Sequence, residues 1–252
     1  MATPTTVGPA EAMVLAAGRS VRLGPLTAGM PKPLLDVGGR PCIEWILLWL
    51  KHHGIARVRI KVHYLPDALM ARIGDGSLLG LHASYLHGDY QTADWMARDL
   101  DSMAETFVLH YGDTLNDSDL GALLARHRAV GEPHVTLGLA RMCGLESRGV
   151  AEMQNGLVTW LDEKPAVPRS GMAFAGTAVI DREAIRNPRR CFVRAGDDFA
   201  RDLVPRIINR RIAVLAHEMI GTVIDIGTPT DLEEARRRWP TPRMLAMTGA
   251  TA

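Results

Sequence analysis

The sequence has little of what marks secreted, disulfide-bonded or membrane proteins. Its three cysteines, Cys42, Cys143 and Cys191, are an odd and widely spaced set that predicts neither a disulfide framework nor a cysteine metal site. No basic region followed by an apolar stretch opens the chain, so we expect no signal peptide. The longest apolar stretch, residues 43–50, contains Glu44 and is too short to span a bilayer. These absences favour a cytoplasmic protein without membrane association.

The chain also lacks an excess of charge of either sign. Its formal net charge is +1 over 252 residues, which argues against nucleic-acid binding through an extended positively charged surface. Apolar residues make up 47% and charged residues 23%, an ordinary balance for a globular protein with a sizeable core. A few local cations are enough for a small phosphorylated ligand, so the low net charge does not exclude a ligand of that kind.

Two common phosphate-binding fingerprints are missing as well. The P-loop needs Lys-Ser or Lys-Thr at a fixed distance from a glycine, and the dinucleotide fingerprint needs three spaced glycines, so an NAD-dependent dehydrogenase is disfavoured. The chain has instead a short apolar run, residues 13–17, that ends at Gly18 and leads into a loop with Arg22 and Lys32. A buried strand followed by a glycine and cations predicts a phosphate site at the carboxyl edge of an α/β sheet.

Hydrophobic periodicity predicts how the rest of the chain is organised. The first half alternates expected strands with helices, and the second half is rich in strands. This order predicts an α/β fold, a Rossmann-like and mostly parallel sheet with helices on both faces, together with a smaller β-rich lobe. The expected strands span 13–17, 57–64, 82–86, 107–111, 135–142, 149–153, 157–162, 173–180, 212–216 and 222–226. The expected helices span 42–53, 66–73, 92–103, 118–129, 198–209 and 229–238, with Asp117 and Thr228 as caps.

Composition and element order also predict the domain boundaries. We expect a disordered N-terminus over residues 1–10, because Thr, Pro, Ala and Gly dominate it. A single domain over 11–240 would follow, with one lobe over about 11–132, a second over about 133–220, and a last strand and helix over 221–240. Residues 241–252 read as a loose tail.

One stretch resembles a known family signature. It reads Leu15-Ala16-Ala17-Gly18, Arg22-Leu23, Pro25-Leu26-Thr27, Pro31-Lys32-Pro33-Leu34-Leu35 and Gly39-Arg40-Pro41, in fixed order. This order resembles the signature of the sugar-1-phosphate nucleotidylyltransferases. The resemblance implies that an NTP and a sugar 1-phosphate react to give an NDP-sugar and pyrophosphate. Ser20 and Val21 depart from the family, which usually has Gly and then Thr or Ser there.

Two aspartates are the candidate metal ligands. Asp113 follows an expected buried strand in Tyr111-Gly112-Asp113, and Asp225 lies in the apolar run Ile224-Asp225-Ile226 before Gly227-Thr228-Pro229. An unpaired carboxylate in such a strand is costly, and a magnesium ion is one remedy. The resemblance implies that both residues bind Mg²⁺. The alternative is a turn-forming Asp113 and an Asp225 capped by backbone amides.

The resemblance also assigns the nucleotide side of the site. It implies nucleotide contacts for Leu15, Ala17, Gly18, Arg22, Lys32, Gln91 and Thr92, with catalytic roles for Arg22, Lys32 and Asp113. Most relatives have Gly-Thr-Ala-Gly where this chain has Gln91-Thr92-Ala93-Asp94. Either the base is read differently, by the Gln91 side chain for example, or the pocket is narrower. We expect Trp95 to be a core residue.

The sugar-phosphate side is assigned in the same way. Glu163-Lys164-Pro165 resembles a family element in which the lysine holds the sugar phosphate and the glutamate contacts sugar hydroxyls. Gly149 and Gly176 resemble the glycines of the family's sugar-pocket strands, and the lobe over 133–220 would then bind the sugar. The alternative for Glu163 and Lys164 is a solvated ion pair in a loop.

The sequence says less about the nucleotide base, the phosphorylated acceptor and the oligomeric state. The short chain and its ending at Asp225-Ile-Gly-Thr-Pro229 resemble most closely the guanylyltransferases acting on heptose, mannose or related 1-phosphates, so GTP is the favoured nucleotide. A uridylyl- or thymidylyltransferase acting on a hexose 1-phosphate is the first alternative, and a cyclitol phosphate acceptor is another. A degenerate regulator that binds nucleotide sugars is motivated by Ser20, Val21, Gln91 and Asp94. Homo-oligomer formation is left open.

Overall fold

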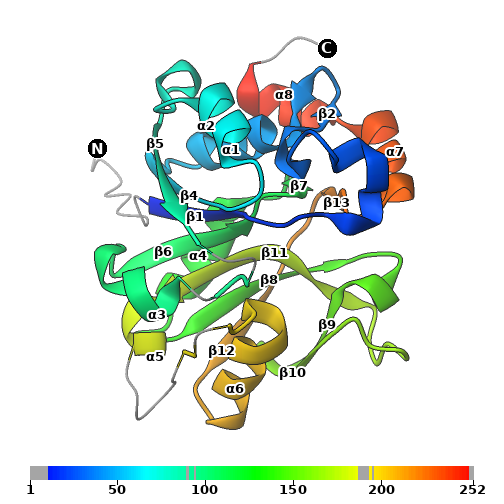
Figure 1. Ribbon diagram of the computed structural model, residues 1–252. Coiled ribbons are helices and arrows are strands. Elements are labelled where there is room, and N and C mark those ends of the chain that lie inside the picture. The colour runs from blue at the N-terminus through cyan, green and yellow to red at the C-terminus, as the bar shows by residue number, and fades with distance from the viewer. Residues whose placement is uncertain (1–10, 89–90, 94, 187–192, 195, 250–252) are drawn as a thin grey trace.

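A central sheet runs through both halves of the chain. The computed structural model describes residues 11–88, 91–93, 95–186, 193–194 and 196–249. Within these residues nine strands form the sheet (Figure 1). They are β1 (Glu11–Ala16), β4 (Arg57–Val62), β5 (His82–His87), β6 (Thr106–Tyr111), β8 (Val135–Arg141), β9 (Gly149–Gln154), β10 (Leu157–Glu163), β11 (Met172–Asp181) and β12 (Val214–Glu218).

The order of the strands divides the sheet into a parallel and a mixed part. The strands lie in the order β5-β4-β1-β6-β11-β8-β12-β10-β9. The first four are mutually parallel, so their carboxyl ends share one edge. From β11 onward the pairings are antiparallel, except that β12 lies parallel to β8. The part built by the first half of the chain thus has the predicted parallel arrangement.

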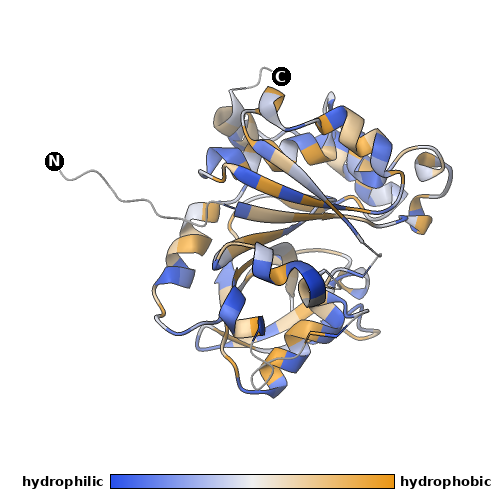
Figure 2. Ribbon diagram, turned by 60° about the vertical axis from the view of Figure 1, so that its left-hand side comes forward, coloured by the Kyte–Doolittle hydropathy of each residue, from blue (hydrophilic) through white to orange (hydrophobic). Residues whose placement is uncertain are grey.

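Helices cover both faces of this sheet, which confirms the predicted α/β fold. Side chains of β1 alternate between two hydrophobic cores, Ala12 and Val14 facing one and Met13 and Leu15 the other. Many of the apolar residues lie in the strands between the two helical layers (Figure 2). The helices are α1 (Cys42–His52), α2 (Pro66–Ile73), α3 (Met96–Asp99), α4 (Leu120–Arg128), α5 (Arg182–Arg186), α6 (Val204–Asn209), α7 (Pro229–Arg238) and α8 (Pro242–Thr248).

Two small sheets add to this frame. β2 (Asp36–Val37) pairs with β3 (Arg40–Pro41), and β7 (Thr114–Asn116) pairs with β13 (Val223–Asp225).

Several local predictions are confirmed in detail. Thr228 caps α7 and forms a capping box with Asp231. Asn155 and Gly156 join β9 to β10 with φ of 53° and 75°, the backbone that a tight hairpin requires.

Three local predictions are wrong. The helix expected over 92–103 is reduced to α3 and a 3-10 turn over Leu100–Ser102, although Trp95 is buried as expected. Asp119, not Asp117, caps α4 by accepting from the Ala122 amide at 3.2 Å. Part of the expected tail is α8, which packs on α1 and buries Met244.

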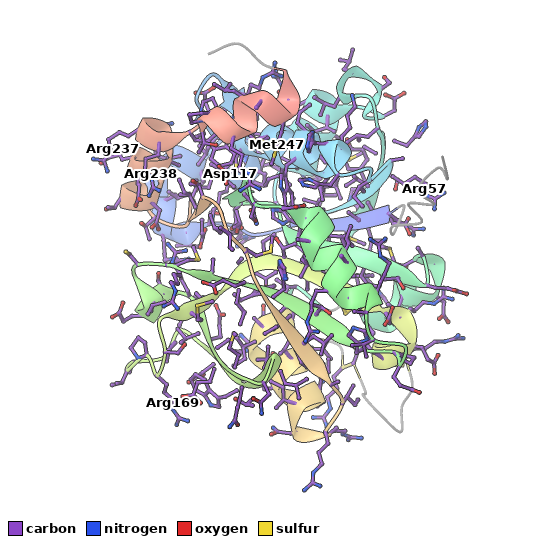
Figure 3. All side chains as sticks on the ribbon, turned by 180° about the vertical axis from the view of Figure 1, so that it is seen from behind. Arg57, Asp117, Arg169, Arg237, Arg238 and Met247 are labelled. Carbon is purple, nitrogen blue, oxygen red and sulfur yellow. The ribbon has the colours of Figure 1, made fainter. Side chains whose placement is uncertain are left out.

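Asp117 has a tertiary role in place of the predicted cap. Its carboxylate accepts hydrogen bonds from the Thr222 amide at 2.6 Å and from the Thr241 hydroxyl at 2.5 Å. Figure 3 shows Asp117 beside α8, whereas Arg237 and Arg238 of α7 lie at the periphery. Asp117 therefore joins the β7 region to the segments that precede β13 and α8.

Residues 1–10 and 250–252 lie outside the described part of the chain, as does Asp94. The division into a nucleotide lobe and a sugar lobe stays a prediction. Among the described residues, no helix is long and apolar enough to cross a membrane.

Candidate functional site

A cavity of about 230 Å³ lies at the carboxyl ends of β1 and β6. This is the edge where the sequence placed the phosphate site. Most of the residues proposed from the sequence line this one cavity, although they come from distant segments. They are Leu15, Ala17, Gly18, Arg22, Thr92, Asp113, Gly149, Glu163, Lys164, Gly176 and Asp225.

The two aspartates meet because β7 pairs with β13. In this antiparallel pair Asp225 lies opposite Thr114, the residue after Asp113. The Ile226 amide donates to the Asp113 carbonyl at 3.0 Å, which extends the pairing by one step. The main chain thus fixes both carboxylates side by side.

Lys32 lies between these carboxylates. Its ammonium is 2.5 Å from Asp113 Oδ2 and 3.5 Å from Asp225 Oδ1, and the side chain is buried. Burial raises the pKa of Asp113, but the attraction and hydrogen bond of Lys32 outweigh it, so the net shift is downward. Burial, followed by repulsion from Asp113, raises the pKa of Asp225 against the attraction of Lys32. The site therefore holds more negative charge than Lys32 alone offsets.

The donor set fits a magnesium ion. Mg²⁺ takes oxygen ligands and is commonly bound through one or two carboxylates together with substrate phosphates. Asp113 and Asp225 both approach the same ammonium, so a single cation at this point reaches both of them. Asp113 and Asp225 are accordingly the residues that would hold the metal.

A second group of potential metal ligands lies elsewhere. His127, His134 and Asp181 bring their donor atoms within 4.8 Å of one another. Asp181 already accepts from the Thr106 hydroxyl at 2.6 Å and from the His134 amide at 3.1 Å, and it contacts His127 Nε2 at 3.1 Å. Despite burial, these hydrogen bonds lower the pKa of Asp181 to about 2. We assign the group a structural role, because these partners already satisfy the carboxylate.

Two glycines of the cavity wall are packed closely against other residues of the wall. A Cβ on Gly149 would lie 2.8 Å from Glu163 Oε2, and one on Gly176 would lie 2.9 Å from Thr114 Oγ1. Gly176 also has φ of 68°, a conformation that favours glycine. Lys164 Nζ lies 3.4 Å from Glu163 Oε1. Both partners line the cavity, and the Lys164 side chain is 53% exposed.

Thr92 lines the cavity, and its neighbour Gln91 does not. The Thr92 hydroxyl donates to Asp198 Oδ2 at 2.8 Å and accepts from the Phe199 amide at 2.6 Å. Gln91 is not among the residues that line the cavity, but its main-chain carbonyl accepts a hydrogen bond from the buried Lys61. The structure gives no support to base reading by the Gln91 side chain.

The departure at Ser20 has a visible backbone consequence. Ser20 adopts φ of 55°, in the left-handed region where glycine is favoured. The next residue, Val21, is 82% exposed. The loop thus keeps a glycine-like shape without a glycine, at some cost in strain.

Sequence reasoning missed three charged residues of the cavity wall: Lys61, Arg148 and Asp198. Lys61 stands between the core residues Ile60 and Val62 in β4. This alternation of basic and apolar residues predicts that the Lys61 side chain faces solvent. In the folded protein this face of β4 is covered, and the Lys61 side chain is buried. The position of Arg148 beside Gly149 was the one available signal for it.

Comparison with known proteins agrees with this architecture. The family model described as nucleotidyl transferase matches residues 11–240. A UTP–glucose-1-phosphate uridylyltransferase of Synechocystis is 27% identical over 247 residues, covering 90% of this chain but 62% of that relative. An N-acetylmuramate α-1-phosphate uridylyltransferase of Neisseria meningitidis serogroup B is 30% identical over 234 residues, covering 90% of this chain and 96% of the relative.

Two solved structures share the fold. One is a Bacillus anthracis protein assigned as a glucose-1-phosphate thymidylyltransferase, with a TM-score of 0.77 and 23% identity over 96% of both chains. The other is HddC from Yersinia pseudotuberculosis, with a TM-score of 0.74 and 18% identity over 91% of this chain and 99% of that one. Because the family model spans almost all of the described residues, the chain belongs to the nucleotidyl transferase family.

Proposed function

We propose that the protein transfers a nucleotidyl group from an NTP to a sugar 1-phosphate, forming an NDP-sugar and pyrophosphate. The observation that carries this proposal is the cavity itself, which brings a carboxylate pair, Asp113 and Asp225, together with Arg22 and Lys164. Lys32 contacts both of these carboxylates. This set of charges suits two phosphorylated substrates and a divalent cation.

The chemistry needs no covalent intermediate on the protein. An oxygen of the sugar phosphate attacks the α-phosphorus of the NTP, a new P–O bond forms, and the bond to the bridging oxygen of the β-phosphate breaks. Pyrophosphate leaves with the electron pair of that bond. Arg22 stabilises the leaving pyrophosphate, Lys32 steadies the α-phosphate, and Lys164 holds the sugar phosphate. Bound Mg²⁺ would neutralise phosphate charge at Asp113 and Asp225.

UTP or dTTP, not GTP, is the proposed nucleotide, which reverses the preference drawn from the sequence. The two related enzymes are uridylyltransferases, and the one that this chain covers for 96% of its length is 30% identical. By the same comparison the proposed acceptor is a hexose 1-phosphate or an N-acetylated hexose derivative. The active-enzyme reading is preferred over a degenerate regulator, because Arg22, Lys32, Asp113, Lys164 and Asp225 meet at one place.

A pyrophosphate-release assay tests the proposal. Each common NTP is paired with glucose 1-phosphate, N-acetylglucosamine 1-phosphate, N-acetylmuramate 1-phosphate, mannose 1-phosphate or a heptose 1-phosphate, in the presence of Mg²⁺. We expect the highest kcat/KM with UTP or dTTP. Highest activity with GTP would restore the guanylyl preference. Tight binding of UDP-sugars without turnover of any pair would favour the regulator.

A further inference from the structure

Arg148 lies in the cavity wall, although neither the signature nor its spacing assigned it a role. It precedes β9, and its main-chain carbonyl accepts from the Lys164 amide at 2.9 Å. The start of β9 thereby lies beside the end of β10. Arg148 and Lys164 consequently stand next to each other where the acceptor phosphate is proposed to bind, and both line the cavity.

The guanidinium of Arg148 is held by three acceptors. Nε donates to the Cys143 carbonyl at 2.9 Å, Nη1 approaches Asp225 Oδ2 at 3.4 Å, and Nη2 approaches Asp231 Oδ1 at 3.3 Å. The side chain is 11% exposed. A guanidinium has five N–H donors, and the bonds among the described residues use three of them. Two donors remain for a ligand.

The contacts to the carboxylates are long for charge-assisted hydrogen bonds, which are usually about 2.7–2.9 Å. The Lys32–Asp113 contact in the same cavity, at 2.5 Å, is far shorter. Nη1 of Arg148 is thus oriented by Asp225 without a tight bond to it. A phosphate oxygen in the cavity can compete for this donor.

The charge of the acceptor calls for a second cation. A phosphate monoester carries about −1.5 to −2 charges near pH 7. Lys164 alone supplies one positive charge, and it is already shared with Glu163 at 3.4 Å. Arginine suits such a partner, because its planar fork binds two phosphate oxygens at once.

We propose that Arg148 binds the phosphate of the sugar 1-phosphate together with Lys164, a role that rests on the proposed function of the same cavity. Nη1 turns from Asp225 to the incoming phosphate, while Nε remains on the Cys143 carbonyl. Asp231 keeps its second oxygen in the α7 capping box, so it needs no movement.

The competing explanation is a structural one, in which Arg148 only ties Asp225 to Asp231. Three variants separate the two. Arg148→Gln removes the cation, Arg148→Lys keeps a charge that cannot span both carboxylates, and Asp231→Asn weakens the tie while leaving the arginine in place. Arg141→Gln, on an exposed cation of β8 that pairs with Glu218, is the matched control.

Steady-state kinetics give the first readout. Arg148→Gln should raise the KM for sugar 1-phosphate about ten- to hundredfold, the size of one charge-assisted contact, with the KM for NTP changed less than threefold. Arg148→Lys should recover only part of the loss, because it keeps the charge without the two-pronged fork. Asp231→Asn should change the KM less than threefold, because the asparagine oxygen can still accept from Nη2, and Arg141→Gln should match wild type. A structural tie would instead make Arg148→Lys and Asp231→Asn resemble Arg148→Gln, chiefly in kcat, and that pattern would overturn the proposal.

A second readout does not need turnover, so it separates this proposal from the function as a whole. Glucose 1-phosphate and inorganic phosphate are titrated with the protein and followed by ³¹P NMR. Wild type, Asp231→Asn and Arg141→Gln should bind a phosphate probe, and Arg148→Gln should bind it at least tenfold more weakly. Equal binding by wild type and Arg148→Gln, or no binding of either probe by wild type, contradicts the assignment even if pyrophosphate is released.

Discussion

Lys32 Nζ lies 2.5 Å from Asp113 Oδ2, in a side-chain pair that joins the signature loop to the end of β6. The ammonium is buried, and its attraction to Asp113 and Asp225 more than offsets the effect of burial, so the pKa of Lys32 is raised. Lys32 therefore stays charged and offsets part of the negative charge of the two carboxylates. We expect a metal ion at this point to release Lys32 toward the nucleotide phosphates.

The first prediction concerns the carboxylate pair. Asp113→Asn or Asp225→Asn should reduce Mg²⁺-dependent turnover by at least a hundredfold, because each removes one of the two charges that would hold the ion. Circular dichroism and a cooperative melt would show that the fold is retained. Asp67→Asn, on an exposed residue of α2, is the control and should be fully active. Near-wild-type rates for both site variants in Mg²⁺ would exclude the proposed metal site.

The second prediction separates the cations by substrate. Lys164→Ala should weaken binding of the sugar phosphate, and Lys32→Ala or Arg22→Ala should weaken binding of the NTP. Loss of one charge-assisted phosphate contact costs about 1.5–3 kcal/mol. Calorimetric titration with NTP alone gives the answer. A Lys164→Ala protein that no longer binds NTP would place Lys164 on the wrong side of the reaction.

The third prediction concerns the hydrogen bond from Lys61, in the cavity wall, to the main-chain carbonyl of Gln91. Gln91 contributes its main-chain carbonyl, which any residue supplies, so Gln91→Gly should change the KM for NTP and the choice of base less than threefold. Lys61→Met removes the buried cation that holds this carbonyl, and it should raise the KM for NTP at least tenfold. Kinetics over the four NTPs compare the two variants. A loss of base preference in Gln91→Gly would instead show that the side chain reads the base.

The fourth prediction is a pH dependence of stability. Burial lowers the pKa of His110 from 6.5 to about 4, against weaker opposing effects of its hydrogen bond to Thr114 and of Asp113. Below pH 6.5 the unfolded chain therefore binds a proton at His110, whereas the folded protein binds that proton only near pH 4. Stability is therefore full above pH 6.5 and is lost as the pH falls toward 4, by roughly 2 kcal/mol at pH 5 for this group.

Urea unfolding at pH 7 and pH 5 measures this effect. The drop in unfolding free energy should be smaller in His110→Gln than in the parent protein. Part of the drop should persist, because burial also lowers the pKa of His53, His134 and His217. Asp181 does not contribute in this range, since the stability linked to its low pKa is lost only below about pH 4. An equal drop in both proteins would remove His110 as a source.

The sequence by itself determined the features that depend on short-range chemistry. The apolar run before Gly18, the Thr228 cap of α7 and the Asn155-Gly156 turn each follow from residues a few positions apart. Local backbone preferences and hydrophobic periodicity act at that range. Many of the cavity residues were also named from the sequence, through the signature over residues 15–41 and through short motifs around Asp113, Glu163 and Asp225.

Tertiary structure decided everything that depends on segments meeting. The pairing of β7 with β13 brings Asp225 to Asp113, and no local pattern specifies that register. Asp117 bonds to Thr222 and Thr241 instead of capping α4, and α8 forms because Met244 finds a buried site against α1. The burial of Lys61 and the reach of Arg148 to Asp225 and Asp231 arise in the same way. Long-range contacts depend on which surfaces the folded chain apposes, and hydrophobic pattern specifies that a face is buried without specifying its partner.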